Sequence, residues 1–327
     1  MKKCIAALML LISKHYAISQ KTPEDFGYKQ MSFKYQNDKV DLIIISKSED
    51  RKKKKPLLFF CQGSLPRPVV IYDEKGLYGT LPFNEVHFLE DYHIVIVGKP
   101  GIPLIANASV LGKKFMYLRD KHKEIPPRNY SDKNHLDYYV SRNNFIIKQL
   151  CKERWVSKSN LVVAGHSEGS AIAVKMAILN PKVSKLIYSG GNPFGRIVTI
   201  LNESAAKKEI VEYWKAIVEN SNVINYDSGD TYKATYSFSL PQRENLLKLK
   251  IPILVTFGSK DTAADYNYLF QVEAIREHKN NIEFIDYVGL EHNFFPLDEN
   301  SEPIYTMGNW DNVANDWLKW INKNTVK

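Results

Sequence analysis

The sequence predicts an α/β protein whose sheet is mostly parallel and carries helices on both faces. Eight short apolar runs recur along the 327 residues, and helical patterns separate the later runs. The first two runs alternate apolar and polar residues, as antiparallel strands do, whereas the later runs are continuously apolar and rich in Val and Ile, like strands buried on both faces. Strand–helix alternation of this kind indicates βαβ crossovers and therefore parallel pairing.

The expected elements follow in chain order. Strands are expected at Met31–Tyr35, Val40–Ser46, Leu57–Gln62, Tyr92–Gly98, Asn160–Gly165, Val183–Ser189, Ile253–Gly258 and Ile282–Val288. Helices are expected near residues 134–153, 168–179, 203–219, 265–279 and 310–323. Two stretches interrupt the alternation. Residues 99–133 are expected to form a long loop at the functional face, and residues 192–250 an inserted cap with a helix, a polar aromatic segment and a second short helix.

The N-terminal segment MKKCIAALMLLISKHYAISQ has the layout of a secretory signal. Two lysines precede a nine-residue apolar run, Cys4–Ile12, and Ala17-Ile18-Ser19 forms a small-x-small cleavage site before Gln20. A buried N-terminal strand or helix is the alternative interpretation. The sequence therefore predicts a signal peptide at residues 1–19, a single domain at residues 20–327, and export to a periplasm or to the extracellular space.

Composition and charge exclude several classes of function. Hydrophobic residues make up 44% of the chain and charged residues 25%, as in ordinary globular proteins, and no later apolar run is long enough to span a membrane. The net charge of +9 falls to +6 without Lys2, Lys3 and Lys14 (9 − 3). Its most concentrated part, RKKKK at 51–55, is expected to be a solvated hairpin tip, since no aromatic residues accompany it as in nucleic-acid-binding segments. Adhesion of this run to anionic surfaces is the weaker alternative.

Two cysteines remain beyond the N-terminal segment. Cys61 lies in an apolar strand and Cys151 near the end of a helix, so both are expected to be buried packing residues. A disulfide between them in an oxidising compartment stays open, because their spacing neither favours nor excludes it.

The segment LVVAGHSEGSAIAVKMA, residues 161–177, places a serine between two glycines where a strand turns into a helix. Such a turn needs small neighbours, here Gly165 and Gly169, and it holds Ser167 in a strained, exposed position at the carboxyl edge of the sheet. The N-terminus of the helix adds free backbone N–H groups that favour a negatively charged oxygen nearby. Ser167 is therefore the candidate nucleophile.

A serine nucleophile needs a base, and the base needs a carboxylate that orients it. In chain order the acid should follow the serine, and the histidine should come last. Asp261 comes just after the strand in IPILVTFGSKDTAAD, and His292 follows the strand in IEFIDYVGLEHNFF. Both residues are thus expected at the sheet edge that carries Ser167. Asp265 is the less suitable acid, because its position favours a helix start.

The oxyanion hole should combine the N–H of Glu168 with an N–H from the loop after the third strand. That loop contains Gln62-Gly63-Ser64, in which the glycine permits close approach of the backbone and the Ser64 N–H is the natural second donor. Each such donor contributes about 3 kcal/mol to transition-state binding. The side chains of His166 and Glu168 are expected to shape the turn and to pack or hydrogen-bond, without a catalytic part.

With these motifs the chain resembles the α/β-hydrolase superfamily, in the group of secreted esterases and acyl-peptidase-like enzymes. The resemblance covers nearly all of residues 20–327 and rests on the elbow Gly165–Gly169, the loops of Asp261 and His292, and the turn Gln62-Gly63-Ser64. The glutamine of that turn stands where many such enzymes have histidine, which is a departure from the HGGG-type lipases. The resemblance implies an eight-stranded, mostly parallel sheet, a small helical cap between strands six and seven, acyl-enzyme chemistry, and neither a cofactor nor a metal.

The substrate is the least determined part of the prediction. Aromatic residues of the cap either line a substrate pocket or form the core of the cap; they are Tyr213, Trp214, Tyr226, Tyr232, Tyr236 and Phe238. The tentative substrate contacts are Gln62, Trp214, Tyr232 and Tyr236. A small-molecule carboxylic ester with a bulky or apolar group is expected, because peptidases of the prolyl-oligopeptidase type bring a large N-terminal propeller that does not fit within 327 residues.

Three alternatives to an esterase remain at this stage. The same triad could serve an aminopeptidase or acyl-peptidase, or a thioesterase. A non-catalytic binding protein on a hydrolase scaffold is less favoured, because such proteins typically lose a triad member and this sequence keeps all three. The protein is expected to be a monomer or a small homo-oligomer, with no nucleic-acid partner and no stable insertion into a membrane.

Overall fold

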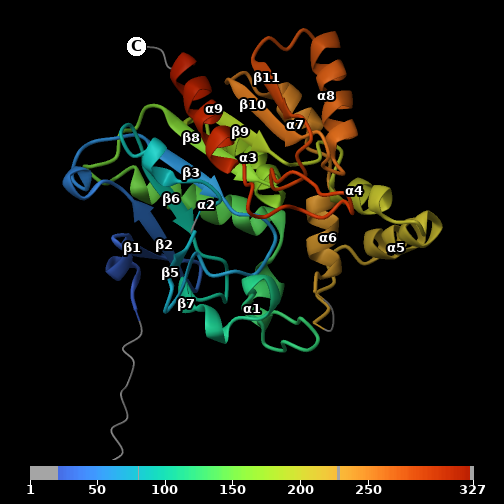
Figure 1. The fold of residues 1–327 in the computed structure, drawn as a ribbon, viewed down its shortest axis with the longest axis horizontal. Coiled ribbons are helices and arrows are strands. Elements are labelled where there is room, and N and C mark those ends of the chain that lie inside the picture. Colours follow the sequence, from blue (N-terminus) through green and yellow to red (C-terminus); the bar gives the residue numbers. More distant parts are fainter. Residues whose placement is uncertain (1–20, 80, 227–228, 325–327) are drawn as a thin grey trace, which may run out of the picture.

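The computed structural model describes residues 21–79, 81–226 and 229–324, so the signal peptide expected at residues 1–19 lies outside the described residues (Figure 1). At the centre of the described part is an eight-stranded sheet. Its strands, in spatial order, are β1 (Lys29–Tyr35), β2 (Asp38–Ile45), β6 (His93–Val97), β3 (Leu57–Cys61), β8 (Leu161–His166), β9 (Val183–Ser189), β10 (Ile253–Gly258) and β11 (Ile282–Tyr287).

The pairing of these strands agrees with the pattern of the sequence. β1 pairs antiparallel with β2, and β2 pairs antiparallel with β6. The other neighbours in the sheet, from β6 to β11, pair in parallel. The eight strands are those that the sequence predicts, and each end lies within about two residues of the predicted one, which is the usual precision of such boundaries.

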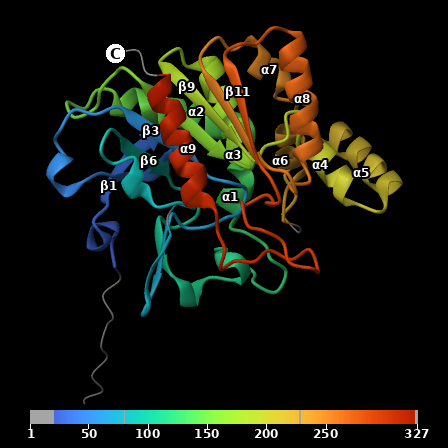
Figure 2. The same cartoon turned by 45° about the horizontal axis from the view of Figure 1, so that its top comes forward.

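Alternate residues of the strands face opposite sides of the sheet and build two cores. On one face, Phe59 of β3 belongs to a cluster with buried residues of α2 (Leu136–Leu150) and α3 (Glu168–Leu179). On the other face, Leu58 belongs to a cluster with buried residues of α9 (Trp310–Lys323). Figure 2 shows α9 in front of the sheet and α2 and α3 behind it. The central strands are continuously apolar because both of their faces are covered.

Between β9 and β10, the sixth and seventh strands of the large sheet in chain order, the described residues form four helices. They are α4 (Arg196–Glu203), α5 (Lys207–Glu219), α6 (Tyr232–Ser239) and α7 (Arg243–Lys248). α4 and α5 project to one side of the sheet, whereas α6 packs against α2 and α7 against α3 (Figure 1). The function of this segment as a cap stays a prediction.

Two details of the 192–250 segment differ from the prediction. The helix expected at 203–219 begins only at Lys207. Glu203 is instead the last residue of a separate helix, α4, and residues 204–206 between the two helices are not helical. The polar aromatic segment contains α6, whose first turn is capped by the Thr231 side chain accepting the Ala234 N–H at 3.0 Å. Aromatic and β-branched residues have low helix propensity, so packing and the cap decide the conformation here.

A small second sheet is the other departure from the sequence prediction. It consists of β5 (Gly76–Tyr78), β4 (Val70–Asp73) and β7 (Ile105–Asn107) in that spatial order. β7 and the short helix α1 (Arg128–Lys133) both lie in residues 99–133, which the sequence predicts as one long loop. Periodicity over three or four residues cannot distinguish such strands from a loop.

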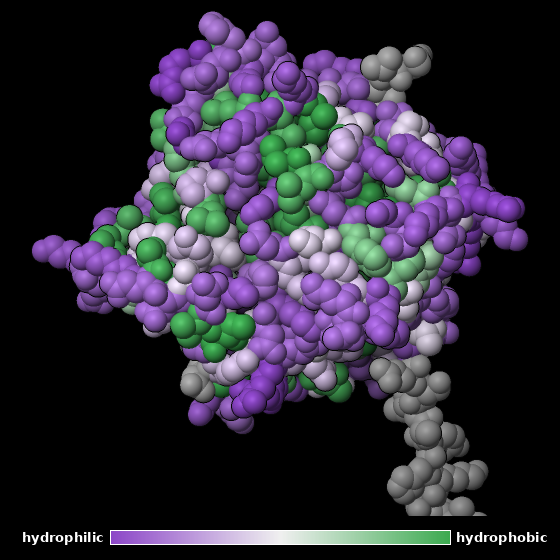
Figure 3. Space-filling view, turned by 180° about the vertical axis from the view of Figure 1, so that it is seen from behind, coloured by the Kyte–Doolittle hydropathy of each residue, from purple (hydrophilic) through white to green (hydrophobic). Residues whose placement is uncertain are grey.

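The basic run at 51–55 is solvated as predicted, except at its last residue, but it is not the tip of a hairpin, because β6 lies between the flanking strands β2 and β3 in the sheet. Arg51 to Lys54 are exposed, whereas Lys55 is buried and its ammonium group pairs with the Asp50 carboxylate and donates to the Leu89 carbonyl at 2.7 Å. Cys61 and Cys151 are both buried and both free. The surface turned away in Figure 1 is a mosaic in which hydrophobic patches are interspersed among hydrophilic residues (Figure 3). Within the described ranges, no helix combines the length and the apolarity that crossing a membrane requires.

Candidate active site

Ser167 occupies the sharp turn between β8 and α3. Its φ of 58° and ψ of −127° lie in a region that non-glycine residues rarely adopt, so the backbone is strained at this position. Three hydrogen bonds hold the turn. The Ser167 N–H donates to the Ser189 carbonyl at 2.9 Å, and the Ser167 carbonyl accepts from the N–H and the hydroxyl of Ser170 at 3.0 and 2.6 Å. The strain therefore persists because the surrounding strands and helix fix the turn.

The two glycines of the turn are required by space, as the sequence predicts. A Cβ atom on Gly165 would lie 2.1 Å from the Gly169 carbonyl oxygen. A Cβ atom on Gly169 would lie 2.1 Å from the Cys61 carbonyl oxygen at the end of β3. Such contacts are far below van der Waals distance, so only glycine allows α3 to begin this close to β8 and β3.

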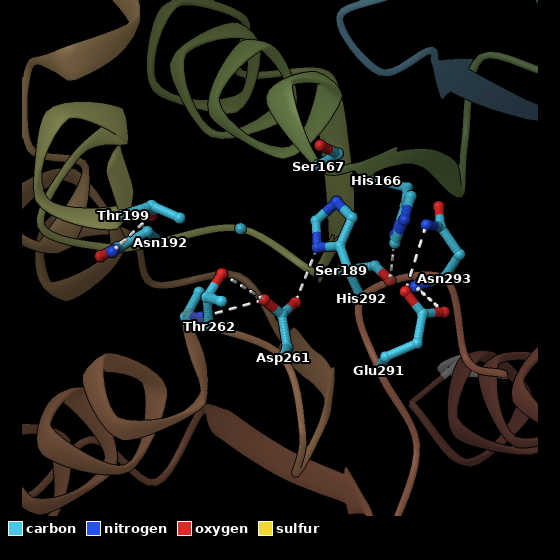
Figure 4. Close-up of polar contacts among 12 residues, drawn as sticks. His166, Ser167, Ser189, Asn192, Thr199, Asp261, Thr262, Glu291, His292 and Asn293 are labelled. Atoms are coloured by element: carbon cyan, nitrogen blue, oxygen red, sulfur yellow. Dashed lines mark hydrogen bonds and ion pairs between the residues drawn. The ribbon is translucent and has the colours of Figure 1, made fainter. Parts of the chain in front are cut away.

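Asp261 and His292 come together at the same edge of the sheet. His292 Nδ1 lies 2.7 Å from Asp261 Oδ2, and the other carboxylate oxygen accepts the Ala263 N–H at 2.9 Å. The Asp261 side chain is 1% exposed. Figure 4 shows the imidazole ring of His292 between Asp261 and Ser167. With Nδ1–H donating to the carboxylate, the Nε2 lone pair is free to accept a proton from the serine.

The surroundings of His292 change its proton affinity. Burial lowers its pKa, but the hydrogen bond and the charge of Asp261, helped by the charges of Glu291 and Glu203, raise it, and the net effect is a pKa above the ordinary 6.5. Nearby His166 behaves in the opposite way, because burial and the charge of His292 lower its pKa far below 6.5. His166 is thus a neutral packing residue, as expected, and its ring lies 5.0 Å from that of His292.

Ser64 and Glu168 provide backbone N–H groups beside the nucleophile. Both residues line one cavity with Ser167, and the turn after β3 passes so close that a Cβ atom on Gly63 would lie 3.5 Å from the Ser167 Cβ. Among the hydrogen bonds of the described residues, neither N–H donates to another protein group. They are therefore available to a negatively charged oxygen formed at Ser167.

The cavity that contains these groups has a volume of about 480 Å³. Its walls are formed by the ends of the strands, by α4 and its preceding turn, and by the loops of Asp261 and His292. The polar residues of the wall include Asn192, Arg196, Thr199, Glu203, Lys260, Thr262 and Glu291, and the apolar ones include Ile200 and Phe238.

The four tentative substrate contacts do not line this cavity. The Gln62 side chain instead donates to the Val97 carbonyl at 2.8 Å and so joins β3 to β6. Trp214 stacks on Tyr236 with ring centroids 5.9 Å apart, and Tyr232 meets Tyr213 edge to face at 6.1 Å. These aromatic side chains therefore pack against one another, as in the alternative of a cap core. Phe238, from the same aromatic set, does line the cavity.

A group of charged residues near the nucleophile was not predicted; the Glu168 side chain in it is buried, whereas those of Arg196 and Asp230 are partly exposed. Arg196 Nη1 lies 3.4 Å from Glu168 Oε2, and the other guanidinium nitrogen pairs with Asp230. Burial raises the pKa of Glu168 to about 7, although the charges of Arg196 and Lys99 oppose that shift. The ammonium group of Lys99 donates to the Gly63 carbonyl. No local pattern signals these contacts, because the residues lie far apart in the sequence and only the fold brings them together.

Comparison with known proteins was made for sequence and for structure. Neither a protein-family model nor a curated protein sequence matches the chain. Among solved structures, an acylaminoacyl peptidase from Pyrococcus horikoshii is 12% identical with a TM-score of 0.56, over 92% of this chain and 42% of that one. The chain thus spans less than half the length of that peptidase.

Two further solved structures match over most of their own length. Est1E from Butyrivibrio proteoclasticus, solved with bound ferulic acid, is 15% identical with a TM-score of 0.53, over 80% of this chain and 90% of that one. The thioesterase domain of the curacin biosynthetic pathway is 12% identical with a TM-score of 0.51, over 90% and 99%. Identities this low show a shared fold, and together with the observed sheet order they establish that the chain has the α/β-hydrolase fold.

Proposed function

We propose that this protein is a serine hydrolase that cleaves a carboxylic ester through an acyl-enzyme intermediate. The observation that supports this most directly is the strained Ser167, which shares one cavity with the hydrogen-bonded pair of His292 and Asp261. Backbone strain at a single serine needs compensation from its surroundings, and strained positions of this kind cluster at active sites. A buried carboxylate bonded to an imidazole is the arrangement that prepares a general base.

The groups in the cavity suffice for acyl transfer in two steps. Ser167 Oγ attacks the carbonyl carbon while His292 Nε2 takes the hydroxyl proton, and the N–H groups of Ser64 and Glu168 stabilise the negative charge on the carbonyl oxygen. The bond to the leaving alcohol then breaks, and the imidazolium gives its proton to the alcohol oxygen. Water attacks the acylated serine in the same way, which releases the carboxylic acid and restores Ser167.

The cavity wall supports an ester of moderate size with both polar and apolar parts. The Thr199 hydroxyl accepts the Asn192 amide at 2.9 Å and keeps its own proton to donate to a substrate, whereas Ile200 and Phe238 offer apolar contact. Among the structural neighbours, Est1E was solved with ferulic acid, a ligand of this mixed character. A thioester is an alternative substrate that the same groups could cleave, and a thioesterase domain is among the neighbours.

Cleavage of aminoacyl amides is a second candidate, which two carboxylates favour. Glu203 and Glu291 both line the cavity beside His292 and could receive the ammonium group of an aminoacyl substrate. Both are already engaged, since Glu203 accepts from the Thr262 hydroxyl at 2.9 Å and Glu291 accepts the Asn293 N–H at 2.7 Å. An ester without an amino group therefore remains the first proposal.

The proposal is tested with chromogenic substrates that share one acyl group and differ in the bond to be cleaved. Esters, thioesters and amides of increasing acyl length, with and without a free α-amino group, are given to the wild type and to Ser167→Ala. We expect ester hydrolysis by the wild type and a loss of roughly 10⁴-fold or more in kcat for Ser167→Ala. The exposed Ser159 gives a matched control, Ser159→Ala, which should keep full activity.

Each outcome has a defined meaning. Equal hydrolysis by the wild type and Ser167→Ala would contradict the serine mechanism, and hydrolysis of amides with a free amino group alone would favour the second candidate. If no substrate is cleaved, a fluorophosphonate probe decides the question. Labelling of Ser167 in the wild type would support the proposed serine mechanism, because the probe reacts with an activated serine. Failure of the probe to label Ser167 would contradict that mechanism.

A further inference from the structure

The turn that carries the second oxyanion donor, Gln62-Gly63-Ser64, is tied to its surroundings at each of its three residues, once through its own Gln62 side chain and twice through side chains from outside it. The Gln62 amide donates to the Val97 carbonyl at 2.8 Å. The Lys99 ammonium donates to the Gly63 carbonyl, and the Tyr130 hydroxyl donates to the Ser64 carbonyl at 2.6 Å. A turn fixed at each residue in this way cannot rotate its peptide groups freely.

The bond from Lys99 acts on the peptide group that contains the donor. The Gly63 carbonyl and the Ser64 N–H belong to the same planar peptide, and in a trans peptide they point in opposite directions. An ammonium group that holds the carbonyl oxygen on one side therefore directs the N–H to the other side. Ser64 lines the cavity with Ser167, so an N–H directed away from Lys99 can meet the oxygen of a carbonyl bound at Ser167.

We infer that Lys99 is a positioning residue of the oxyanion hole, whose ammonium group fixes the Gly63–Ser64 peptide so that the Ser64 N–H faces the substrate oxygen at Ser167. This inference rests on the proposed function. It assigns to Lys99 a part in the reaction without contact to the substrate. A charged donor on the carbonyl also polarises the peptide, which makes the Ser64 N–H a stronger donor in turn.

The position of Lys99 in the fold explains how it reaches the turn. Lys99 follows β6, and Gly63 follows β3, and these two strands are parallel neighbours whose carboxyl ends lie side by side. The lysine is 7% exposed, and its ammonium nitrogen lies 5.7 Å from the centre of the Tyr130 ring. A buried ammonium group is costly unless it is hydrogen-bonded and paired. The hydrogen bond to the Gly63 carbonyl therefore helps to keep Lys99 charged in this buried position.

Several charged and titratable groups face Lys99 from the elements around it. Burial lowers the pKa of Lys99 to about 8, the charges of Glu168 and Asp230 oppose this, and those of Arg142 and Arg67 add to it. Burial also raises the pKa values of the neighbouring Tyr130, Tyr139 and Cys61, so these groups stay neutral while Lys99 titrates. Glu168, with a pKa of about 7, ionises before Lys99 loses its proton. Above pH 8 the amine becomes neutral, and a neutral amine is a weaker donor to the Gly63 carbonyl.

The test compares the wild type with Lys99→Met and Lys99→Arg. The rate constant for labelling of Ser167 by a fluorophosphonate, and kcat and KM for the best ester, are measured from pH 6 to pH 10. For Lys99→Met at pH 7 we expect labelling and kcat to fall about 10- to 100-fold, less than the roughly 100- to 1000-fold for outright loss of an oxyanion donor because the Ser64 N–H is still present, while KM changes less than about threefold. Lys185→Met, which removes a buried lysine of β9, is the matched control and should keep the wild-type rates.

Lys99→Arg separates a positioning role from a purely structural one. A guanidinium group also donates to a carbonyl but does not lose its proton in this pH range. We expect Lys99→Arg to recover much of the rate at pH 7 and to lack the fall in rate above pH 8 that the wild type shows. If circular dichroism shows that Lys99→Met does not fold, the role of Lys99 is tested by comparing the pH profiles of the wild type and Lys99→Arg.

The outcomes distinguish this inference from the function on which it rests. A wild type that neither cleaves esters nor reacts with the probe overturns the proposed function. An active wild type with Lys99→Met within twofold of its rates overturns the inference alone. The inference also fails if wild type and Lys99→Arg show the same fall in rate above pH 8, because that fall would then belong to another group.

Discussion

At the scale of single residues, the pair of His292 and Asp261 sets the pH range in which the site can work. A general base must be neutral, and the net effect of its surroundings is to raise the pKa of His292 above 6.5. The rate should therefore fall as the pH decreases through a value above 6.5. Asp261→Asn removes the carboxylate whose hydrogen bond and charge raise the pKa of His292. The burial that lowers this pKa remains, so the pKa of His292 should be lower in the variant.

We accordingly expect two changes in Asp261→Asn. The acidic limb of the profile of kcat/KM against pH should move to lower pH, and the plateau should drop by about 10⁴-fold because the imidazole loses its orienting partner. Asp265→Asn is the matched control, since Asp265 lies exposed in the first turn of α8 (Ala264–Arg276). If the acidic limb shifted in Asp265→Asn but not in Asp261→Asn, the assignment of Asp261 as the orienting acid would be wrong, and Asp265 would take that role.

The meeting of the three candidate catalytic residues at one sheet edge was predictable from the sequence for a physical reason that does not extend to the rest of the candidate site. Ser167, Asp261 and His292 each follow a strand, and parallel strands bring such positions to one edge whatever lies between them. Lys99 and Arg196 instead reach their partners, the Gly63 carbonyl and the Glu168 carboxylate, through long side chains. Their direction depends on packing, which no local pattern of the sequence records.

At the scale of elements, the turn from β8 to α3 depends on the closeness of α3 to two strands. A Cβ atom on Gly169 would lie 2.1 Å from the Cys61 carbonyl oxygen and 2.7 Å from that of Gln62. Both neighbours are backbone atoms and cannot move aside as a flexible side chain could. The start of α3 would have to shift, and with it Ser167 and the Glu168 N–H.

For Gly169→Ala we therefore expect a loss of about 3 kcal/mol in the free energy of unfolding, at the upper end for overpacked sites. We also expect kcat/KM to fall about 100-fold, because a displacement near 1 Å at the nucleophile has an effect of that size. Gly229→Ala is the control, since its Cβ would meet nothing within 4 Å, and it should change stability by less than about 0.5 kcal/mol. Denaturant unfolding and ester kinetics measure both quantities, and similar effects in the two variants would contradict the packing argument.

The elements that the sequence predicts most closely are two helices of at least three turns and two strands that are buried along nearly their whole length. α3, α9, β9 and β10 have the same bounds in the structure as in the prediction. The elements that it misses are short or of ambiguous composition, namely α1, α4, α6 and the three strands of the small sheet. Their conformation is decided by tertiary contacts and caps, which override weak local preferences.

At the scale of the whole molecule, the site depends on the large sheet as one unit. The nucleophile, the acid and the histidine follow β8, β10 and β11, whereas Ser64 and Lys99 follow β3 and β6. All of these strands lie side by side in the sheet, and helices cover both of its faces. Loss of either layer of helices should therefore disturb the site and the fold together.

Trp317 on α9 offers the sharpest test of this dependence. Its side chain is fully buried, packs edge to face on Phe83 at 5.6 Å, and donates its indole N–H to the Thr256 hydroxyl on β10 at 3.3 Å. Removal of a large buried aromatic side chain leaves a cavity that the sheet cannot collapse to fill. For Trp317→Ala we expect a loss of about 3–5 kcal/mol in the free energy of unfolding.

Two observables of denaturant unfolding check whether the molecule responds as one unit. Far-ultraviolet circular dichroism reports the helices, and labelling of Ser167 by the fluorophosphonate reports the site at the carboxyl edge of the sheet. In Trp317→Ala both midpoints should move by the same amount to lower denaturant, since coincident transitions indicate a single cooperative unit. Lys319→Ala, on the exposed side of α9 with a side chain 78% exposed, should leave both midpoints in place. A label that is lost well before the helices would show instead that the site unfolds independently of the α9 layer.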